Sequence, residues 1–253
     1  MDDRTEHGIP RAVAIAWGMA ETPQRGPRRG LSHERIVEAA IEIADADGLA
    51  AVTMQRVAES LGFTTMSLYR YVANKGELLT LMQDAASKLP KVDTWPPPEG
   101  WQEGIRQLAI QLTEIYRART WMLELPRYER AVLMPNAMEF AERAMAALEP
   151  LPLDTEQRVA VILNLAVLAE GFCRLEINLA EEEVTEFDAH DIQLLSEVIT
   201  PERFPLLAPL VVTGSWAGSP ETGHGHVSGE FERGLQWLIS GIEQLAAQAS
   251  SPG

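Results

Sequence analysis

Apolar side chains recur every three or four residues along most of this chain, and no stretch alternates convincingly with the period of a β-strand. In residues 31–89, polar residues suited to helix N-caps divide this pattern into four short helices. These caps are Ser32, Thr53, Thr64 and Asn74. The four helices are expected to end at Asp47, Leu61, about Tyr71 and about Lys88.

A proline-rich stretch, residues 90–100, is followed by periodic segments that are all typical of α-helices. The helices expected there are 101–118, 120–133, 136–148, 155–183, 188–199, 202–212 and 228–248. Residues 214–226, rich in Gly, Ser and His, predict a flexible loop. The pattern thus predicts an all-α chain with three parts. They are a flexible arm over 1–30, a small helical domain with a connecting helix over 31–89 and a larger helical domain over 90–253.

The segment from Thr53 to Val72 has the spacing of a helix-turn-helix, the motif that places its second helix in the DNA major groove. Ala58 is small enough to let two helices cross closely. Gly62, four residues later, tolerates the left-handed backbone of a tight turn. Leu68 returns the next helix to the core. An ordinary three-helix packing unit with a glycine turn has the same spacing, so both interpretations remain open at this point.

The first turn of the second helix carries hydroxyl groups and a flexible apolar side chain. Thr64, Thr65 and Ser67 can contact base edges or phosphates, and Met66 can contact a thymine methyl group. This composition favours a DNA-reading helix over a purely structural one.

The run GFTTMSLYRYV, residues 62–72, together with NKGELL, residues 74–79, closely resembles the DNA-binding signature of the tetracycline-repressor (TetR) family. Three upstream runs share this likeness: RIVEAA at 35–40, DGL at 47–49 and TM at 53–54. The resemblance covers about residues 31–82. The chain departs from the family at Tyr71 and Val72, where His and then Phe are frequent. Tyr71 keeps a ring that can form hydrogen bonds.

The resemblance implies DNA-contacting roles residue by residue. Residues 64–67 would read or border bases, Tyr69 and Tyr71 would reach phosphates or sugar edges, and Lys75 and Thr53 would meet phosphates at helix N-termini. The expected DNA-binding residues are Thr53, Gln55, Arg56, Thr64, Thr65, Met66, Ser67, Tyr69, Arg70, Tyr71 and Lys75, with Arg28 and Arg29 of the arm. The two arm arginines either enter a minor groove or stay solvated.

The net charge of −16 at first argues against nucleic acid, but its distribution matters more than its total. Residues 25–80 hold seven basic and seven acidic groups, so the whole excess of acid lies elsewhere. From Ser60 to Gly76 there is no acid, only Arg70 and Lys75. Binding to non-specific DNA is expected to be weak, because phosphate neutralisation drives it.

Two late segments carry the pattern of association helices. Residues 159–169 are almost wholly apolar and predict a helix buried on all sides, with Asn164 as an exception that needs a polar partner. A heptad-like seam predicts the dimer interface: Phe231, Leu235, Leu238, Ile242 and Leu245. An intramolecular core helix is the alternative. A homodimer is favoured because one helix-turn-helix reads few base pairs and two-fold pairing matches a palindromic operator.

The resemblance also implies a repressor whose C-terminal domain binds a small-molecule effector and moves the DNA-reading parts. Candidate ligand contacts are Trp121, Met122, Tyr128, Met138, Asn164 and Phe172. The alternative for the aromatic and methionine side chains is an ordinary core. Asn164 has three candidate partners: a ligand, another helix or a dimer contact.

Other classes of function find little support. The single cysteine, Cys173, lies on an apolar helix and is expected to be an inert thiol in a reducing compartment. The histidine pair, His224 and His226, lacks further ligands at a metal-binding spacing. No apolar run is long enough to span a membrane, and no signal peptide is evident. The expectation is therefore a cytoplasmic regulator without cofactor, metal or catalytic activity, with a helical, DNA-blind interaction module as the remaining alternative.

Overall fold

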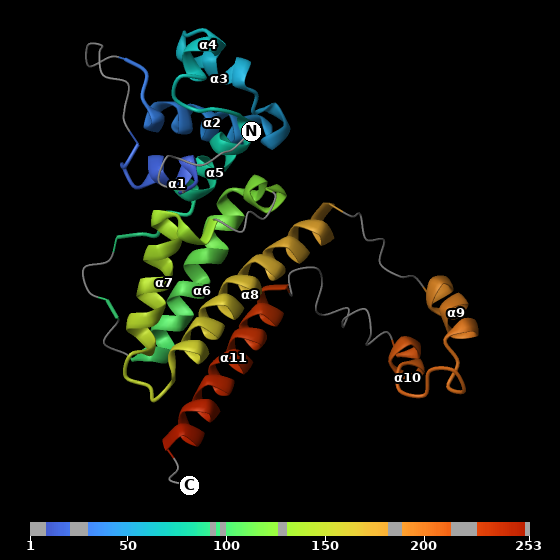
Figure 1. Ribbon diagram of the computed structural model, residues 1–253. Coiled ribbons are helices and arrows are strands. Elements are labelled where there is room, and N and C mark those ends of the chain that lie inside the picture. The colour runs from blue at the N-terminus through green and yellow to red at the C-terminus, as the bar shows by residue number, and fades with distance from the viewer. Residues whose placement is uncertain are drawn as a thin grey trace.

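The computed structural model describes residues 9–20, 30–91, 95–96, 100–125, 131–181, 189–213 and 227–250. Within these ranges the chain forms helices joined by turns and contains no β-strand, which confirms the all-α prediction. Figure 1 shows a small group of helices, α1 to α5, at one end of four longer helices. No described helix is both long and apolar enough to cross a membrane.

The N-terminal unit contains the four helices that the capping pattern predicts. They are α2 (His33–Asp47), α3 (Met54–Leu61), α4 (Thr65–Leu68) and α5 (Lys75–Ala86). Each begins after a side chain that accepts a hydrogen bond from a backbone amide of the first turn, as predicted. The caps and their donors are Ser32 from Arg35, Thr53 from Arg56, Thr64 from Ser67, and Asn74 from Glu77.

The turn between α3 and α4 follows the predicted mechanics. Gly62 adopts a left-handed backbone with φ 75° and ends α3, where its amide and that of Phe63 bond back to the helix. Ala58 and Leu68 are fully buried on the two sides of this turn. The turn therefore fixes how α4 leaves α3.

Helix α4 is shorter than predicted, because it ends at Leu68 instead of about Tyr71. The Tyr71 amide bonds to the Leu68 carbonyl at 2.8 Å, three residues back, so the chain tightens into a turn. The Val72 amide bonds to the same carbonyl at 2.9 Å, which closes the turn. Arg11 donates to the Tyr71 carbonyl from α1 and so holds this turn from outside.

Three other segments differ from their predictions. The arm over residues 1–30 includes a helix, α1 (Arg11–Ala16), which packs its apolar side chains into the N-terminal core. The expected helix 120–133 forms two 3-10 turns, Thr120–Glu124 and Ala131–Leu133, since Pro126 forces Leu125 into an extended backbone. Only α10 (Ala208–Val212) forms in 202–212, which prolines interrupt.

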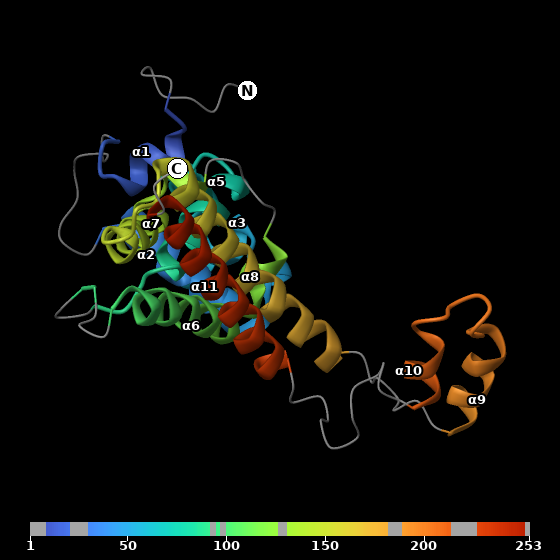
Figure 2. The same cartoon turned by 90° about the horizontal axis from the view of Figure 1, so that it is seen from below.

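The C-terminal unit packs four long helices side by side (Figures 1 and 2): α6 (Trp101–Ala118), α7 (Pro135–Leu148), α8 (Thr155–Glu181) and α11 (Val227–Ser250). Helices α9 (Ala189–Val198) and α10 pack on each other and lie apart from this bundle in both views. The two hydrophobic cores do not divide at residue 90. Trp121, Met122 and Met134 belong to the core of the N-terminal unit.

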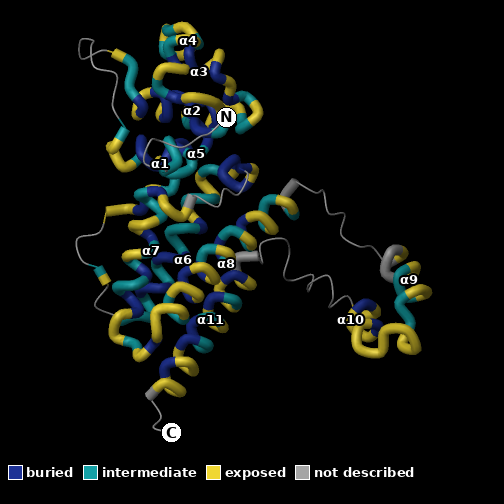
Figure 3. Tube along the Cα trace, in the orientation of Figure 1, coloured by how far each residue is buried: buried dark blue, intermediate teal, exposed yellow. Residues whose placement is uncertain are grey.

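Helix α8 is not buried on all sides, and this expectation was wrong for the single chain. Its inner face, with Leu165 and Ala169, packs on α6 and α11. Its other face is an exposed apolar stripe (Figure 3) formed by Val159, Leu163, Val167 and Leu175. One chain supplies neighbours for only one side of this helix, so these apolar side chains remain in solvent.

Cys173 lies in the core of the C-terminal unit, as expected. Its Sγ is 3.7 Å from the Thr113 carbonyl oxygen. Burial raises the pKa of the Cys173 thiol to about 11, and Glu176 adds to the rise while Arg117 opposes it. A thiol in this state is a poor nucleophile at neutral pH.

Cys173 is therefore expected to resist alkylation in the native protein. At pH 8 only about one thiol in a thousand would be ionised, and its burial further slows reaction with iodoacetamide. Intact-mass spectrometry would follow the reaction in buffer and in concentrated urea, where labelling should become fast. Rapid labelling in buffer would contradict the burial of this side chain.

Candidate nucleic-acid interface

The outer face of α4 combines exposed apolar and polar side chains at the far end of the molecule (Figure 1). Met66 is 75% exposed, although it is a large apolar residue, and Tyr69 and Arg70 are also exposed. Thr65 and Ser67 are half-buried on the same short helix. An apolar tip flanked by hydroxyls and a cation is suited to contact with base edges and phosphates.

The predicted hydroxyls have a local role as well. Thr64 Oγ1 accepts from the Ser67 amide at 3.3 Å and lies 3.0 Å from Ser67 Oγ, so these two side chains hold the start of α4. This arrangement orders the first turn of the helix before any ligand arrives. Lower conformational entropy in the free state reduces the cost of binding.

The predicted contacts at α3 are engaged within the chain. Thr53 caps the helix, and Gln55 Nε2 donates to Glu59 Oε1 at 2.8 Å. Arg56 forms an ion pair with Asp47, and both side chains are about half exposed. These polar groups lie on the surface but must exchange intramolecular partners to reach a phosphate.

Lys75 is exposed at the first position of α5. Free amides of the first helical turn and the positive end of the helix dipole lie at the same end of α5. No acidic residue lies between Ser60 and Gly76, so nothing in the sequence of this segment neutralises the charge. Lys75 and the N-terminus of α5 together suit a phosphate group.

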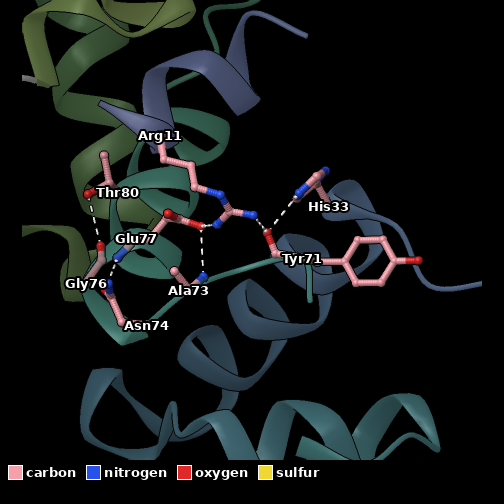
Figure 4. A network of polar contacts seen from close by, with 8 residues as sticks. All are labelled: Arg11, His33, Tyr71, Ala73, Asn74, Gly76, Glu77 and Thr80. Atoms are coloured by element: carbon pink, nitrogen blue, oxygen red, sulfur yellow. Dashed lines mark hydrogen bonds and ion pairs between the residues drawn. The ribbon is translucent and has the colours of Figure 1, made fainter. Parts of the chain in front are cut away.

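Tyr71 is half-buried rather than presented freely. Its ring packs edge-on against the His33 ring, with centroids 5.5 Å apart. Its hydroxyl end points away from the polar contacts around its carbonyl (Figure 4). Arg28 and Arg29 lie outside the described residues, so their predicted role stays a prediction.

A buried network that no sequence pattern predicted lies behind α4 (Figure 4). Glu77 of α5, with a side chain only 1% exposed, forms an ion pair with Arg11 of α1 and accepts from the Ala73 amide at 3.0 Å. Arg11 Nη2 also donates to the Tyr71 carbonyl at 2.9 Å, and His33 Nε2 lies 3.0 Å from the same oxygen.

A capping pattern in the sequence could have drawn attention to Glu77, which stands three residues after the Asn74 cap. No local pattern marks Arg11, because its contacts lie 60 or more residues away along the chain.

Three of the five residues predicted at the dimer seam are buried within the single chain. Phe231, Leu235 and Ile242 are buried in the hydrophobic core of their own chain, where α11 packs on α8. The heptad spacing serves an intramolecular contact, the alternative noted above. Leu238 is half-buried and Leu245 is partly exposed beside a shallow groove between α8 and α11.

The predicted ligand contacts do not converge on one pocket. Trp121 and Met122 are buried in the N-terminal core, where Trp121 Nε1 donates to Asp45 Oδ1 at 2.7 Å. Met138 is exposed. Phe172 packs edge-on against Phe231 with centroids 5.8 Å apart. Tyr128 lies outside the described residues.

Asn164 points outward and has an ordinary partner. Its Nδ2 donates to the Ala160 carbonyl at 2.8 Å, one turn back on α8, and the residue is exposed on the groove beside α11. It therefore does not project a polar group into the interior of the C-terminal unit.

Comparison with known proteins identifies both units. Residues 36–82 match the family described as bacterial regulatory proteins, tetR family. Residues 95–246 match the family described as tetracyclin repressor-like, C-terminal domain. The first match contains most of α2, all of α3 and α4 and the first two thirds of α5, and the second contains α6 to α10 and most of α11. Helix α1 lies outside both.

Two similar proteins cover nearly the whole chain. The HTH-type transcriptional repressor DrrR1 of Streptomyces coeruleorubidus is 33% identical over 95% of this chain and 87% of its own length. An HTH-type transcriptional regulator of Saccharopolyspora erythraea is 26% identical over 96% of this chain and 95% of its own length.

Among solved structures, ActR of Streptomyces coelicolor is similar along most of the chain. Its complex with actinorhodin has a TM-score of 0.69 at 26% identity, and covers 88% of this chain and 100% of ActR. Its complex with (S)-DNPA has a TM-score of 0.66 at 27% identity, and covers 85% and 98%. The chain belongs to the TetR family of bacterial transcriptional regulators, and α3 and α4 form its DNA-binding helix-turn-helix.

Proposed function

We propose that the protein is a homodimeric repressor that binds a palindromic operator through α4 and leaves it when a small molecule binds the C-terminal unit. The observation that carries the DNA-binding part is the exposed tip of α4. Met66 projects there into solvent beside Thr65, and Lys75 lies nearby in sequence within a stretch free of acid. Contact with a DNA groove would cover this apolar side chain and satisfy the basic groups.

The exposed apolar stripe of α8 supports the homodimer. Leu163 is 54% exposed in the single chain, and Trp237 of α11 is 69% exposed. The groove between α8 and α11, bordered by Leu238 and Leu245, joins the same surface. A second copy related by a two-fold axis would bury this face against its own equivalent. Two α4 helices would then read the two halves of a palindrome.

Direct polar contacts between the two units support release by an effector. Asp84 of α5 accepts from the Asn136 amide of α7 at 2.9 Å, and Asn136 Nδ2 donates back to the Asp84 carbonyl at 3.0 Å. Burial raises the pKa of Asp84, although the bonds from Asn136 oppose the rise. ActR has been solved with two small molecules, actinorhodin and (S)-DNPA. An effector would act by binding better to the state that cannot hold the operator.

The first test is a gel shift with purified full-length protein and the DNA upstream of its own gene, at ~150 mM salt. Non-specific binding is weak under these conditions. The expected result is a discrete complex that unrelated competitor DNA does not displace. If none forms, selection from random DNA locates the operator. If the selection also fails, the result would favour the alternative function, a helical interaction module that does not bind DNA.

Two substitutions should separate phosphate contact from base reading. Lys75→Glu is expected to weaken binding to every DNA sequence by about tenfold or more, since it removes one phosphate contact and adds repulsion. Met66→Ala is expected to change the preference at one base position by about 1 kcal/mol, because it removes apolar contact area.

The measurement for these two variants is equilibrium binding to a set of single-base operator variants. The recognition-helix assignment would be wrong if both variants bound all sequences as the wild type does. Glu230→Gln on α11, an exposed change far from α4, serves as the control and should leave the binding profile unchanged.

The dimer face has its own test. Leu163→Glu would place a charge at the centre of the proposed interface in both subunits, and should raise the dimer dissociation constant on the order of a hundredfold. Leu194→Glu on α9 is the matched control, since Leu194 is 50% exposed and lies outside the stripe. Sedimentation velocity at micromolar concentration should show a dimeric wild type and control. A dimeric Leu163→Glu variant would place the interface elsewhere.

A further inference from the structure

Helix α1 packs on the N-terminal unit, and the residue that follows it contacts the 3-10 turn before α7. Along its length, Val13 and Ile15 are buried in the N-terminal core against α5. A six-residue helix is too short to be stable alone in water, so its conformation depends on these contacts. Because α1 lies outside both family matches, nothing in those matches assigns it a role.

One end of α1 holds the turn that follows the DNA-binding helix α4. Arg11 pairs with the buried Glu77 carboxylate and donates to the Tyr71 carbonyl at 2.9 Å. The same Glu77 oxygen accepts from the Ala73 amide at 3.0 Å. One guanidinium group thus ties the two ends of the turn between α4 and α5 (Figure 4). The angle of α4 relative to α5 depends on this turn.

The other end of α1 reaches the C-terminal half of the chain. Trp17 Nε1 donates to the Leu133 carbonyl at 2.8 Å, although the indole is 49% exposed. Leu133 lies in the 3-10 turn directly before α7, and Asn136 at the start of α7 is the residue that bonds to Asp84. Any shift of the start of α7 therefore displaces the carbonyl that anchors α1.

We propose that α1 is a strut that couples the start of α7 to the turn behind the DNA-binding helix, with Arg11 as the positioning residue and Trp17 as the anchor. This inference rests on the proposed function for its effect on operator binding. The strut is a further connection beside the Asp84–Asn136 contact and the Arg119–Asp45 ion pair. A shift near Leu133 would move Arg11, and the turn from Tyr71 to Glu77 would follow.

Three variants of the full-length chain test the strut. Arg11→Lys keeps a positive charge beside Glu77 but removes the second donor to Tyr71. Trp17→Phe keeps an aromatic ring and removes only the bond to Leu133. The third variant combines both. Arg143→Lys on α7 is the matched control, because Arg143 also pairs with a carboxylate, that of Glu139, and donates to a carbonyl, that of Pro90.

The first readout is hydrogen exchange of the protein without DNA, and so does not depend on the proposed function. Trp17→Phe is expected to speed exchange of the amides in residues 69–77. These residues contact Arg11, at the end of α1 opposite to the lost bond. Arg11→Lys is expected to speed exchange in 131–136, because coupling between two sites is reciprocal. Faster exchange only beside each substituted residue would overturn the strut.

The second readout is affinity for the selected operator, measured well below the thermal midpoint of each variant. Each single variant should bind the operator about three- to tenfold more weakly than the wild type does. The double variant should bind no more weakly than whichever single variant has the lower affinity. The control should bind as the wild type does. Fold-changes that multiply in the double variant, or variants that all bind normally, would overturn the proposal. If the wild type selects no DNA sequence, the proposed function fails, while hydrogen exchange still decides whether the strut exists.

Discussion

A buried carboxylate organises the N-terminal unit. The Glu77 side chain is almost wholly removed from water, and such a charge is tolerated only when donors surround it. Arg11 and the Ala73 amide both donate to Oε1, while Oε2 is buried without a hydrogen-bond partner among the described residues. Breaking a buried pair of this kind typically costs about 3–5 kcal/mol, a large fraction of the stability of a small helical unit. The turn that follows α4 is therefore held by a buried ion pair.

Local features of the N-terminal unit could be predicted from the sequence because they depend on neighbouring residues. The four caps need only a side-chain oxygen and an amide within three residues, and Gly62 needs only its own backbone freedom. The exposure of Met66 follows from its position opposite Leu68 on one short helix. The α1 helix and the Arg11–Glu77 pair escaped prediction, since they join segments that are distant in the sequence.

The C-terminal unit shows the complementary limit of sequence reasoning. Periodicity identifies the apolar face of a helix but does not say which molecule covers it. Phe231 and Leu235 form a seam that one chain fills by itself, whereas Leu163 and Trp237 remain in solvent. The ligand candidates show the same limit. Trp121 and Phe172 are aromatic residues at helical spacing, and each is engaged in a different core.

The contact between Asp84 and Asn136 also bears on how the chain is completed during synthesis. Helix α7 begins without a side-chain cap from its own segment, and the carboxylate of α5 accepts one of its first amides instead. The N-terminal helices leave the ribosome first, so Asp84 cannot pair with Asn136 until the chain has been made as far as α7. The core of the N-terminal unit also contains Trp121, Met122 and Met134, so that core is complete only when the chain has been made as far as the start of α7. The pairing of Asp84 and the completion of this core therefore belong to the same stage of synthesis.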